Sequence, residues 1–293
     1  MTPHSLLQRA WGAFRGRPLP LIGAALLLVF LLLAALAPYI TPQNPYDLQQ
    51  LDILDGRLPP GSHATEGGYT YWLGTDEQGR DLWSAILFGL RTSLLVGVAS
   101  TAVSLVIGTL LGMLAAYRGG FFDALLMRVA DLQLSFPSIL VAMILVAVFG
   151  RGVDKVIAAL IIVQWAYYAR TARSAALVER RKEYVEAARS LGLSAPRIIV
   201  GHLLPNCLPP LMVVAALQVA SAIALEATLS FLGVGLQVTE PSLGLLISNG
   251  YKYLLSGNYW ISFFPGLALL LTIVAINLVT DHLRDVLNPR LQR

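Results

Sequence analysis

The stretch Glu183-Tyr184-Val185-Glu186-Ala187-Ala188-Arg189-Ser190-Leu191-Gly192, followed by His202-Leu203-Leu204-Pro205-Asn206, is a charged insert between strongly apolar runs. Its Ala, Leu, Arg and Glu residues favour helix, and Gly192 interrupts that helix as a turn. Ser194 can cap a second short helix, with Pro196 in its first turn, and we expect Pro205 to end it. The insert thus predicts two short helices joined at a glycine corner. Charges can pair along one face of the first helix, Lys182 with Glu186 and Glu186 with Arg189.

The composition around this insert is that of a membrane protein. The chain of 293 residues is 56% hydrophobic and 13% charged, whereas about a quarter of a typical soluble domain is charged. A spanning helix needs roughly 20 mostly apolar residues. Six runs meet that need, at 19–40, 92–117, 132–150, 153–170, 208–233 and 259–281. The sequence therefore predicts an all-α polytopic membrane protein with six transmembrane helices.

The distribution of Lys and Arg indicates the orientation, because these residues concentrate on the cytoplasmic side of membrane proteins. With the N-terminus inside, fifteen of them fall in cytoplasmic segments and five in external ones. This bias places both termini in the cytoplasm, together with the charged insert, which forms a cytoplasmic loop at 170–206.

The first apolar run could be mistaken for a signal peptide. Its apolar core, Leu19–Ala37, is longer than that of a signal peptide, so we expect an uncleaved helix. A cytoplasmic N-terminal segment at 1–18 then precedes a single membrane domain at 19–293.

The longest hydrophilic segment, at 41–90, lies on the external side in this arrangement. It holds seven acidic and two basic residues, and its prolines and glycines favour irregular loop. Two interpretations stay open. The segment is either a lid or contact surface for an external partner, or a solvated connection between two helices.

Two polar residues lie inside the fifth apolar run. Glu226 and Gln218 are eight residues apart, a little over two helical turns, so they project to roughly the same face. Ionisable groups inside a membrane are costly and often functional, so one interpretation is a translocation path lined by both residues. The alternative is a structural role, in which Glu226 is hydrogen-bonded to a neighbouring helix or to water.

Three small residues share one face of the second apolar run, namely Ser104, Gly108 and Gly112. Small residues let helix backbones approach closely in a membrane. They indicate a tight helix crossing, either within the chain or with a partner.

The spacing of Glu186-Ala187-Ala188, Gly192, His202 and Leu204-Pro205 resembles the cytoplasmic signature loop of ABC-importer permeases. Further stretches resemble the dipeptide, oligopeptide and nickel branch of that family, and most closely its second-type (C-type) permease subunit. They are Leu73–Asp81, Asp131–Pro137, Glu226–Gly233, Phe264–Gly266 and Asp281–Arg290. His202 departs from the general family pattern, which has an aliphatic residue there, but is usual in this branch.

The resemblance implies the type I ABC-importer permease fold in a bacterial inner membrane. It implies that the cytoplasmic loop docks an ATPase through Glu183, Glu186, Ala187, Ala188, Gly192, Leu193 and Pro205. The implied partners are a homologous permease subunit, forming a heterodimer, two ABC ATPase subunits and an external substrate-binding protein. The chain itself is then not an enzyme, and ATP and Mg belong to the partner ATPases. Peptides are the implied substrates, with nickel chelates, glutathione or opine-like solutes as alternatives.

Several other functions are disfavoured by the residues themselves. The sequence has no Gly-x-x-x-x-Gly-Lys-Ser/Thr motif, so the chain does not bind ATP through a P-loop. Its four histidines are scattered, and its one cysteine, Cys207, allows neither an internal disulfide nor a thiolate metal cluster. An ion-coupled secondary transporter would need inverted repeats or several buried carboxylates. The basic loop could bind anionic lipid, but lipid binding leaves the Glu-Ala-Ala to Leu-Pro spacing unexplained. No motif supports nucleic-acid binding.

Overall fold

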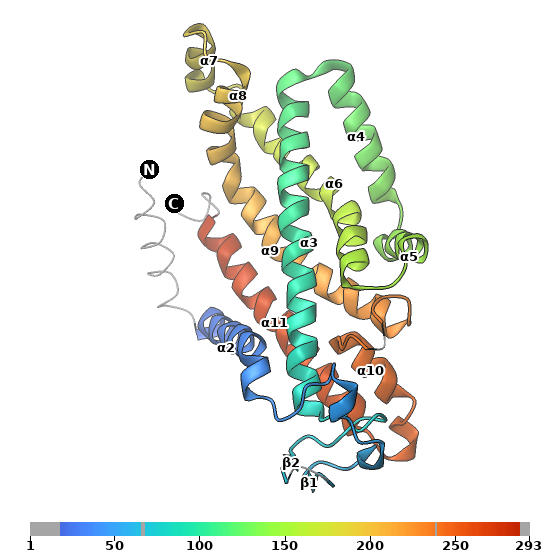
Figure 1. The fold of residues 1–293 in the computed structure, drawn as a ribbon. Coiled ribbons are helices and arrows are strands. Elements are labelled where there is room, and N and C mark those ends of the chain that lie inside the picture. Colours follow the sequence, from blue (N-terminus) through green and yellow to red (C-terminus); the bar gives the residue numbers. More distant parts are fainter. Residues whose placement is uncertain (1–17, 66–67, 238, 288–293) are drawn as a thin grey trace.

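The chain is mostly helical. The computed structural model describes residues 18–65, 68–237 and 239–287, so the segment expected at 1–18 lies outside this part except for Pro18, and the tail stretch is described only to Leu287. The long helices surround a central α3 (Figure 1). They are α2 (Pro18–Ile40), α3 (Leu82–Arg118), α4 (Gly120–Ser135), α5 (Ser138–Phe149), α6 (Val153–Glu179), α9 (Leu204–Phe231) and α11 (Trp260–Leu287).

Shorter elements connect the long helices. Strands β1 (Ser62–His63) and β2 (Thr70–Tyr71) form an antiparallel pair between α2 and α3. Helices α7 (Glu183–Ser190) and α8 (Ala195–Ile198) lie between α6 and α9, and α10 (Leu243–Tyr251) precedes α11. The remaining elements are 3-10 turns at Leu48–Gln50, Ile53–Asp55 and Leu254–Ser256 and a wider, π-type turn at Ile199–Leu203.

Helix α3 carries the core of the bundle. Its first half packs against α9, α10 and α11 in a buried cluster that includes Leu90, Leu94, Ile223, Leu246 and Ile276. Its last turns pack against α6 and α9, in a cluster that includes Met113, Tyr168, Ala172, Cys207 and Leu211.

The approach of α3 to α6 depends on two glycines. A Cβ atom on Gly108 would lie 2.4 Å from the carbonyl oxygen of Trp165, and one on Gly112 would lie 2.2 Å from that of Ala169. Any side chain at either glycine would therefore force the two backbones apart. The small-residue face thus makes a crossing within this chain, which decides between the two interpretations that the sequence leaves open.

Four segments are long and apolar enough to cross a membrane, namely α2, α3, the segment Ala195–Phe231 and α11. The pair α4 and α5 is a fifth candidate, but the two helices bend by 95° at their junction. Helix α6 has 27 residues but is not apolar enough to be counted among these candidate spans. The described part of the chain thus supports four or five spans, whereas the sequence predicts six.

The apolar run at 132–150 is divided between two helices. Pro137 separates α4 from α5, and Phe136 before it is extended, with φ −92° and ψ 144°. A residue that precedes proline is disfavoured in the helical region, so the chain turns there.

Three other predicted boundaries shift. Helix α3 begins at Leu82, so the segment predicted at 41–90 ends at Asp81. Asp81 is the N-cap of α3, and its carboxylate accepts a hydrogen bond from the Ser84 amide at 2.9 Å. A search for apolar runs overlooks such a cap. Helices α6 and α11 continue to Glu179 and Leu287, beyond their apolar runs, because charged residues such as Arg and Glu also favour helix.

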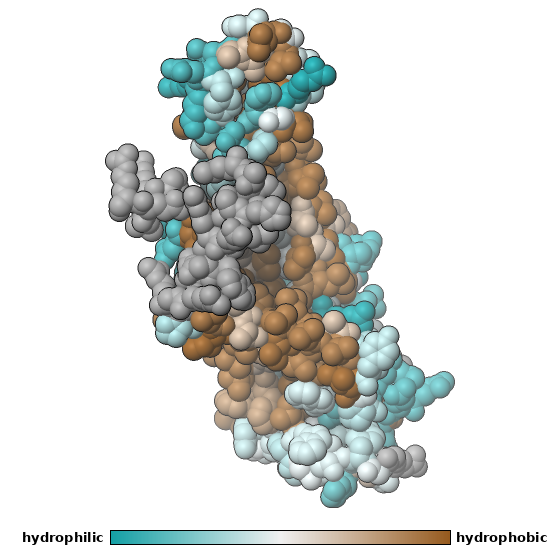
Figure 2. All heavy atoms as spheres, turned by 90° about the vertical axis from the view of Figure 1, so that its left-hand side faces the viewer, coloured by the Kyte–Doolittle hydropathy of each residue, from teal (hydrophilic) through white to brown (hydrophobic). Residues whose placement is uncertain are grey.

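The surface is divided into zones along the long axis of the molecule. Figure 2 shows a broad hydrophobic band across the middle, a hydrophilic end around α7 and α8, and a more polar end around β1 and β2. Large apolar side chains exposed on the helices include Leu28 of α2, Val106 and Leu110 of α3, and Leu270 of α11. An apolar belt of this kind suits the hydrocarbon core of a bilayer.

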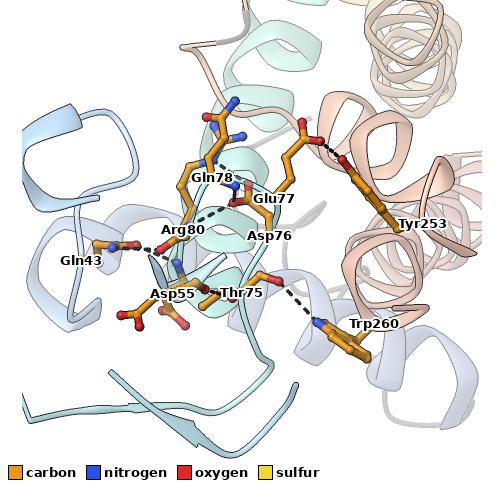
Figure 3. A network of polar contacts seen from close by, with 11 residues as sticks. Gln43, Asp55, Thr75, Asp76, Glu77, Gln78, Arg80, Tyr253 and Trp260 are labelled. Carbon is orange, nitrogen blue, oxygen red and sulfur yellow. Dashed lines mark hydrogen bonds and ion pairs between the residues drawn. The ribbon is translucent and has the colours of Figure 1, made fainter. Parts of the chain in front are cut away.

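The segment between α2 and α3, expected to be irregular, is held by a buried polar network (Figure 3). The carboxylate of Asp76 accepts hydrogen bonds from the Gln78 and Arg80 amides at 2.8 and 3.0 Å, and from Arg80 Nε at 2.7 Å. The side chains of Asp76 and Arg80 are 0% and 1% exposed. Removing one partner of a buried ion pair costs about 3–5 kcal/mol, so this pair fixes the turn.

Further hydrogen bonds tie the same segment to the helices (Figure 3). Trp260 Nε1, at the start of α11, donates to the Thr75 carbonyl at 3.3 Å, and the Tyr253 hydroxyl donates to Glu77 at 2.7 Å. The Asp81 amide donates to Gln43 Oε1 at 2.6 Å. The segment 41–81 is therefore anchored at the start of α3 and at the corner between α10 and α11.

A second buried carboxylate, Asp55, stabilises the two-stranded sheet. It accepts hydrogen bonds from the Tyr71 hydroxyl at 2.8 Å and the Thr65 hydroxyl at 2.5 Å. Burial alone raises the pKa of Asp55, but the hydrogen bonds from Thr65 and Tyr71 outweigh it and lower this pKa below its ordinary value. The folded-state pKa is thus below the unfolded one, so this stabilisation is present at neutral pH and is lost as the pH falls through the folded-state pKa.

The start of α2 and the end of α11 lie side by side. A hollow of about 310 Å³ is lined by Pro18, Leu19 and Pro20 on one side and by Leu278, Asp281, His282 and Asp285 on the other. Leu287 also borders Glu179 and Asn206, at the base of the connection between α6 and α9. The end of α11 therefore lies near the base of the insert that carries α7 and α8.

We expect Gly112→Leu to destabilise the protein strongly, because the new side chain must displace the α6 backbone at Ala169. Overpacking of this kind costs about 3 kcal/mol, which thermal unfolding in detergent would measure. Gly266→Ala in α11 is the matched control, since a Cβ there meets nothing within 4 Å. A Gly112→Leu protein as stable as the wild type would contradict the α3–α6 contact.

Candidate functional site

The charged insert forms the glycine corner that its sequence predicts. Gly192 follows α7 with a φ of 73°. Its N–H donates to the Arg189 carbonyl at 2.9 Å, and the N–H of Leu193 donates to the Ala188 carbonyl at 3.2 Å. This pair of bonds is a Schellman motif, which needs a residue that tolerates the left-handed region. Gly192 therefore decides where the first helix ends.

A small apolar core holds the two helices of the insert together. Val185, Ala188, Ile198 and Leu203 are buried, and Leu193 and Tyr117 of α3 pack against them. Two of the predicted docking residues, Ala188 and Leu193, therefore lie on the inside of the corner and shape it.

The other predicted residues of the corner face outward. Glu183, Glu186, Ala187 and Gly192 are exposed. The two glutamates lie in the first turn of α7, where the helix dipole favours negative charge. A Cβ on Gly192 would meet nothing within 4 Å. The corner thus presents a short exposed edge at one tip of the molecule (Figure 1).

The predicted ion pairs on α7 are wrong. Lys182 is the N-cap of α7, so its ammonium reaches back to Glu179 at 2.7 Å and does not pair with Glu186. Arg189 lies over the ring of Tyr117, with its guanidinium carbon 5.3 Å from the ring centroid. Glu179 is three residues before Lys182, a spacing that the sequence offers, whereas Tyr117 on α3 is far from Arg189 in the sequence and could not be predicted from it.

Tyr184 connects α7 to both long helices that flank it. Its hydroxyl donates to Glu179 Oε2 at 2.7 Å and accepts from Asn206 Nδ2 at 3.2 Å. Burial, followed by the bond to Glu179, raises the pKa of Tyr184 to about 12, so the hydroxyl keeps its proton. The sequence did not single out this residue, since a tyrosine in a charged helix carries no signal of its own.

The insert is also attached to the end of α3. The guanidinium of Arg180 donates to the carbonyl of Ala116, one of the last-turn carbonyls that a helix leaves without an intrahelical partner. Arg189 adds the stacking contact on Tyr117. The corner is therefore supported from α3, α6 and α9 together.

Pro205 does not end a helix, contrary to the prediction. Helix α8 passes into the π-type turn at Ile199–Leu203 and continues as α9, and the Leu204 amide donates to the Ile199 carbonyl. Proline has no N–H for a regular helical bond, and the wider turn before it accommodates this loss. Pro205 is exposed in the first turn of α9. Ser194 and Pro196 occupy the predicted start of α8, although Ser194 forms no side-chain cap bond.

The two polar residues of the fifth run have different surroundings. Glu226 is 0% exposed, and its carboxylate accepts hydrogen bonds from Ser93 of α3 and from Ser230, both at 2.8 Å. Gln218 is half-buried, and its backbone carbonyl accepts a hydrogen bond from the side-chain amide (Nε2) of Gln164 on α6 at 3.3 Å. Both positions therefore take part in contacts between helices, with partners that the sequence did not indicate.

A hollow of about 620 Å³ lies between α6 and α9 at the base of the insert. Its lining is mixed, with Arg170, Thr171, Ser174, Glu179 and Asn206 as polar residues and Ala175, Val178, Pro209, Pro210 and Leu287 as apolar ones. In the described parts of the chain, no group of three or more His, Cys, Asp or Glu side chains could hold a metal ion.

Residues 108–293 match the family model described as "Binding-protein-dependent transport system inner membrane component". The chain belongs to this family. A second model, the N-terminal transmembrane domain of oligopeptide transport permease C, matches residues 5–60 of this inner membrane component. The family and the apolar helices together make it a multi-pass protein of the bacterial inner membrane.

Curated relatives of this inner membrane component include three named as C-type permeases. It is 39% identical to "Probable D,D-dipeptide transport system permease protein DdpC" of Escherichia coli (strain K12), over 94% of this chain and 89% of the relative. It is 38% identical to "Di/tripeptide transport system permease protein DppC" of Pseudomonas aeruginosa (strain UCBPP-PA14), over 98% and 93%. It is 34% identical to "Dipeptide transport system permease protein DppC" of Bacillus subtilis (strain 168), over 99% and 87%. The resemblance to the C-type branch is confirmed.

The fold of this inner membrane component is similar to that of a chain of the MetNI methionine ABC transporter, solved in an inward-facing conformation. The TM-score is 0.56 at 20% identity, over 71% of this chain and 97% of the other. The likeness confirms the permease fold.

We expect Glu226→Leu to lower the free energy of unfolding by about 1–3 kcal/mol, because the hydroxyls of Ser93 and Ser230 lose their buried acceptor. Glu226→Gln keeps a carbonyl oxygen and should lower it less. Thermal unfolding of both variants in detergent checks this order. An unchanged stability in Glu226→Leu would show that the two hydrogen bonds do not stabilise the α3–α9 contact.

Proposed function

We propose that this chain is one of two homologous permease subunits that form a heterodimer in an ATP-driven importer of di- or oligopeptides. Two ABC ATPase subunits bind on the cytoplasmic side and an external substrate-binding protein on the other. The chain forms half of the translocation path and carries out no ATP hydrolysis itself. The exposed glycine corner at Glu183–Leu193, supported from three helices, carries this proposal.

The corner suits an ATPase groove for a physical reason. Its edge of Glu183, Glu186, Ala187 and Gly192 is exposed, while Ala188 and Leu193 fix its shape from inside. A rigid corner passes on a displacement that a flexible loop would absorb. ATP can drive transport only by binding one ATPase arrangement better than another and passing that difference to the permease.

The membrane arrangement has six spans with both termini in the cytoplasm. It counts α4 and α5 as one broken span and adds α6 to the four apolar segments. The excess of Lys and Arg around α7 and α8 supports a cytoplasmic position for this end. The neighbouring start of α2 and end of α11 support the same side for the termini. The apolar band is in contact with lipid.

The opposite end, at 41–81, faces the substrate-binding protein. Its buried network of Asp76, Arg80 and Asp55 gives the surface a fixed shape, which a protein partner can recognise with little ordering cost. Trp72 is 75% exposed on this surface and is an apolar contact for such a partner.

The relatives' names support peptides as the substrate class. The same machinery importing nickel chelates, glutathione or opine-like solutes is the alternative. In this proposal Gln218 and Glu226 lie beside the translocation path. Glu226 contributes by holding α3 against α9 through its hydrogen bond with Ser93. Uptake that stays at the wild-type level in Glu226→Gln across several peptides would leave this residue a structural role alone.

The docking proposal is tested by Gly192→Trp and Glu186→Lys in the complete transporter. We expect each variant to reduce co-purification of the ATPases at least about tenfold, the equivalent of about 1.4 kcal/mol. The reason is that both new side chains project from the exposed edge and meet little of this chain. Peptide uptake should fall in parallel.

Gly119→Trp is the matched control for Gly192→Trp. Gly119, at the corner between α3 and α4, has a φ of 66° against 73° for Gly192, and a Cβ there also meets nothing within 4 Å. Gly119 also has a ψ of −158°, a combination found almost only in glycine, so the control substitution carries backbone strain as well. A loss of docking seen only in Gly192→Trp would therefore come from contact with a partner. Unchanged ATPase co-purification and uptake in Gly192→Trp and Glu186→Lys would refute the docking proposal.

A further inference from the structure

The ends of three helices meet at one hydroxyl group. Glu179 is the last residue of α6, Tyr184 lies in the first turn of α7, and Asn206 lies in the first turn of α9. The Tyr184 hydroxyl donates to Glu179 at 2.7 Å and accepts from Asn206 at 3.2 Å. One side chain of the corner is therefore bonded to the helix that enters the insert and to the helix that leaves it.

The connection between α6 and α7 is short, and the hydrogen bonds of Tyr184 span it. Only Arg180, Arg181 and Lys182 separate the two helices, and α7 has eight residues. A helix so short is marginal on its own, and three turn residues can absorb a rotation between α6 and α7. The two bonds of Tyr184 close this hinge, because α7 cannot rotate without breaking them.

Glu179 and Asn206 also line the hollow of about 620 Å³ between α6 and α9. The first turns of α9 beyond Asn206 contribute Pro209 and Pro210 to the same lining. A displacement that reaches Glu179 and Asn206 therefore moves the two walls of this hollow directly.

We propose that Tyr184 is a positioning residue that locks α7 to α6 and α9, so that a displacement of the corner moves both long helices. The proposal rests on the docking function of the corner and adds the residue through which the motion passes. Docking itself needs only the shape of the corner, whereas coupling needs the lock.

The shape of the corner does not depend on the Tyr184 hydroxyl. Val185, Ala188, Ile198 and Leu203 form its apolar core, and the stack of Arg189 on Tyr117 attaches it to α3. Tyr184→Phe keeps the aromatic ring and removes both hydrogen bonds. The variant is therefore expected to fold, to assemble and to dock while losing the hydrogen bonds that link α7 to Glu179 of α6 and Asn206 of α9.

The experiment uses the complete transporter, with both permeases, the ATPases and the binding protein, reconstituted in liposomes. Tritiated dialanine is the transported probe, and uptake is measured per ATP hydrolysed. In Tyr184→Phe we expect co-purification of the ATPases to stay at the wild-type level and uptake per ATP to fall at least about fivefold. Tyr39→Phe is the matched control, since Tyr39 is 85% exposed at the end of α2.

A double-mutant comparison separates a lock from general loosening. Asn206→Leu removes the second bond of the Tyr184 hydroxyl. If both bonds act as one lock, the double variant Tyr184→Phe/Asn206→Leu loses no more uptake per ATP than the stronger of the two single variants. Losses that multiply would show independent roles and would overturn the proposal.

Two outcomes separate this inference from the docking function. Wild-type uptake per ATP in Tyr184→Phe, together with lost docking in Gly192→Trp, would overturn the lock and leave the docking function intact. Normal docking in both Gly192→Trp and Glu186→Lys would remove the basis of both proposals. A Tyr184→Phe protein that loses its ATPases would also overturn the lock, because the hydroxyl would then be needed for the shape of the corner.

Discussion

Gly108 and Gly112 let the backbones of α3 and α6 come into direct contact, and the arrangement of the other helices depends on that contact. Lipid tails give helices no hydrophobic reason to associate, so close packing of backbones has to hold such a bundle together. Once α6 lies along α3, its last turns reach the end of α3, and Arg180 can bond to the Ala116 carbonyl. The same alignment brings Arg173 to Asp123 of α4 at 2.5 Å. The position of the corner thus depends on a backbone contact between α3 and α6.

The parts of the fold that follow from local chemistry could be predicted from the sequence. The apolar runs gave the long helices, and the left-handed conformation that only glycine adopts freely gave the corner at Gly192. The failures involve prolines and caps. Pro205 was expected to stop a helix, but the wider turn before it lets the helix continue into α9. Pro137 separates α4 from α5 within one predicted run. The start of α3 was missed because the Asp81 cap lies eleven residues before the predicted run at 92–117.

In the candidate site, too, features set by local sequence could be predicted, whereas those set by partners on other helices could not. Spacing in the sequence identified the corner, including the buried Ala188 and the partly buried Leu193, whose positions follow from the geometry of its turn. It could not identify Tyr184, Ser93 or Gln164, because their roles are set by partners on other helices. The charge of Glu226 stands out in the sequence. The serine hydroxyls that donate hydrogen bonds to it in the interior follow no pattern that a single sequence reveals. Long-range hydrogen bonds therefore account for most of what the sequence left out.

The position of Cys207 has a consequence for experiments on this protein. It is the one thiol of the chain and it is 0% exposed, packed with Met113, Tyr168 and Leu211 directly below the corner. A thiol reagent added to the folded protein has no access to it, so cysteines placed elsewhere would be labelled without background. The same burial makes Cys207 a built-in reporter. Its sulfur becomes reactive only when the first turn of α9 separates from α3 and α6, so the rate of labelling would follow the opening of the bundle at that point.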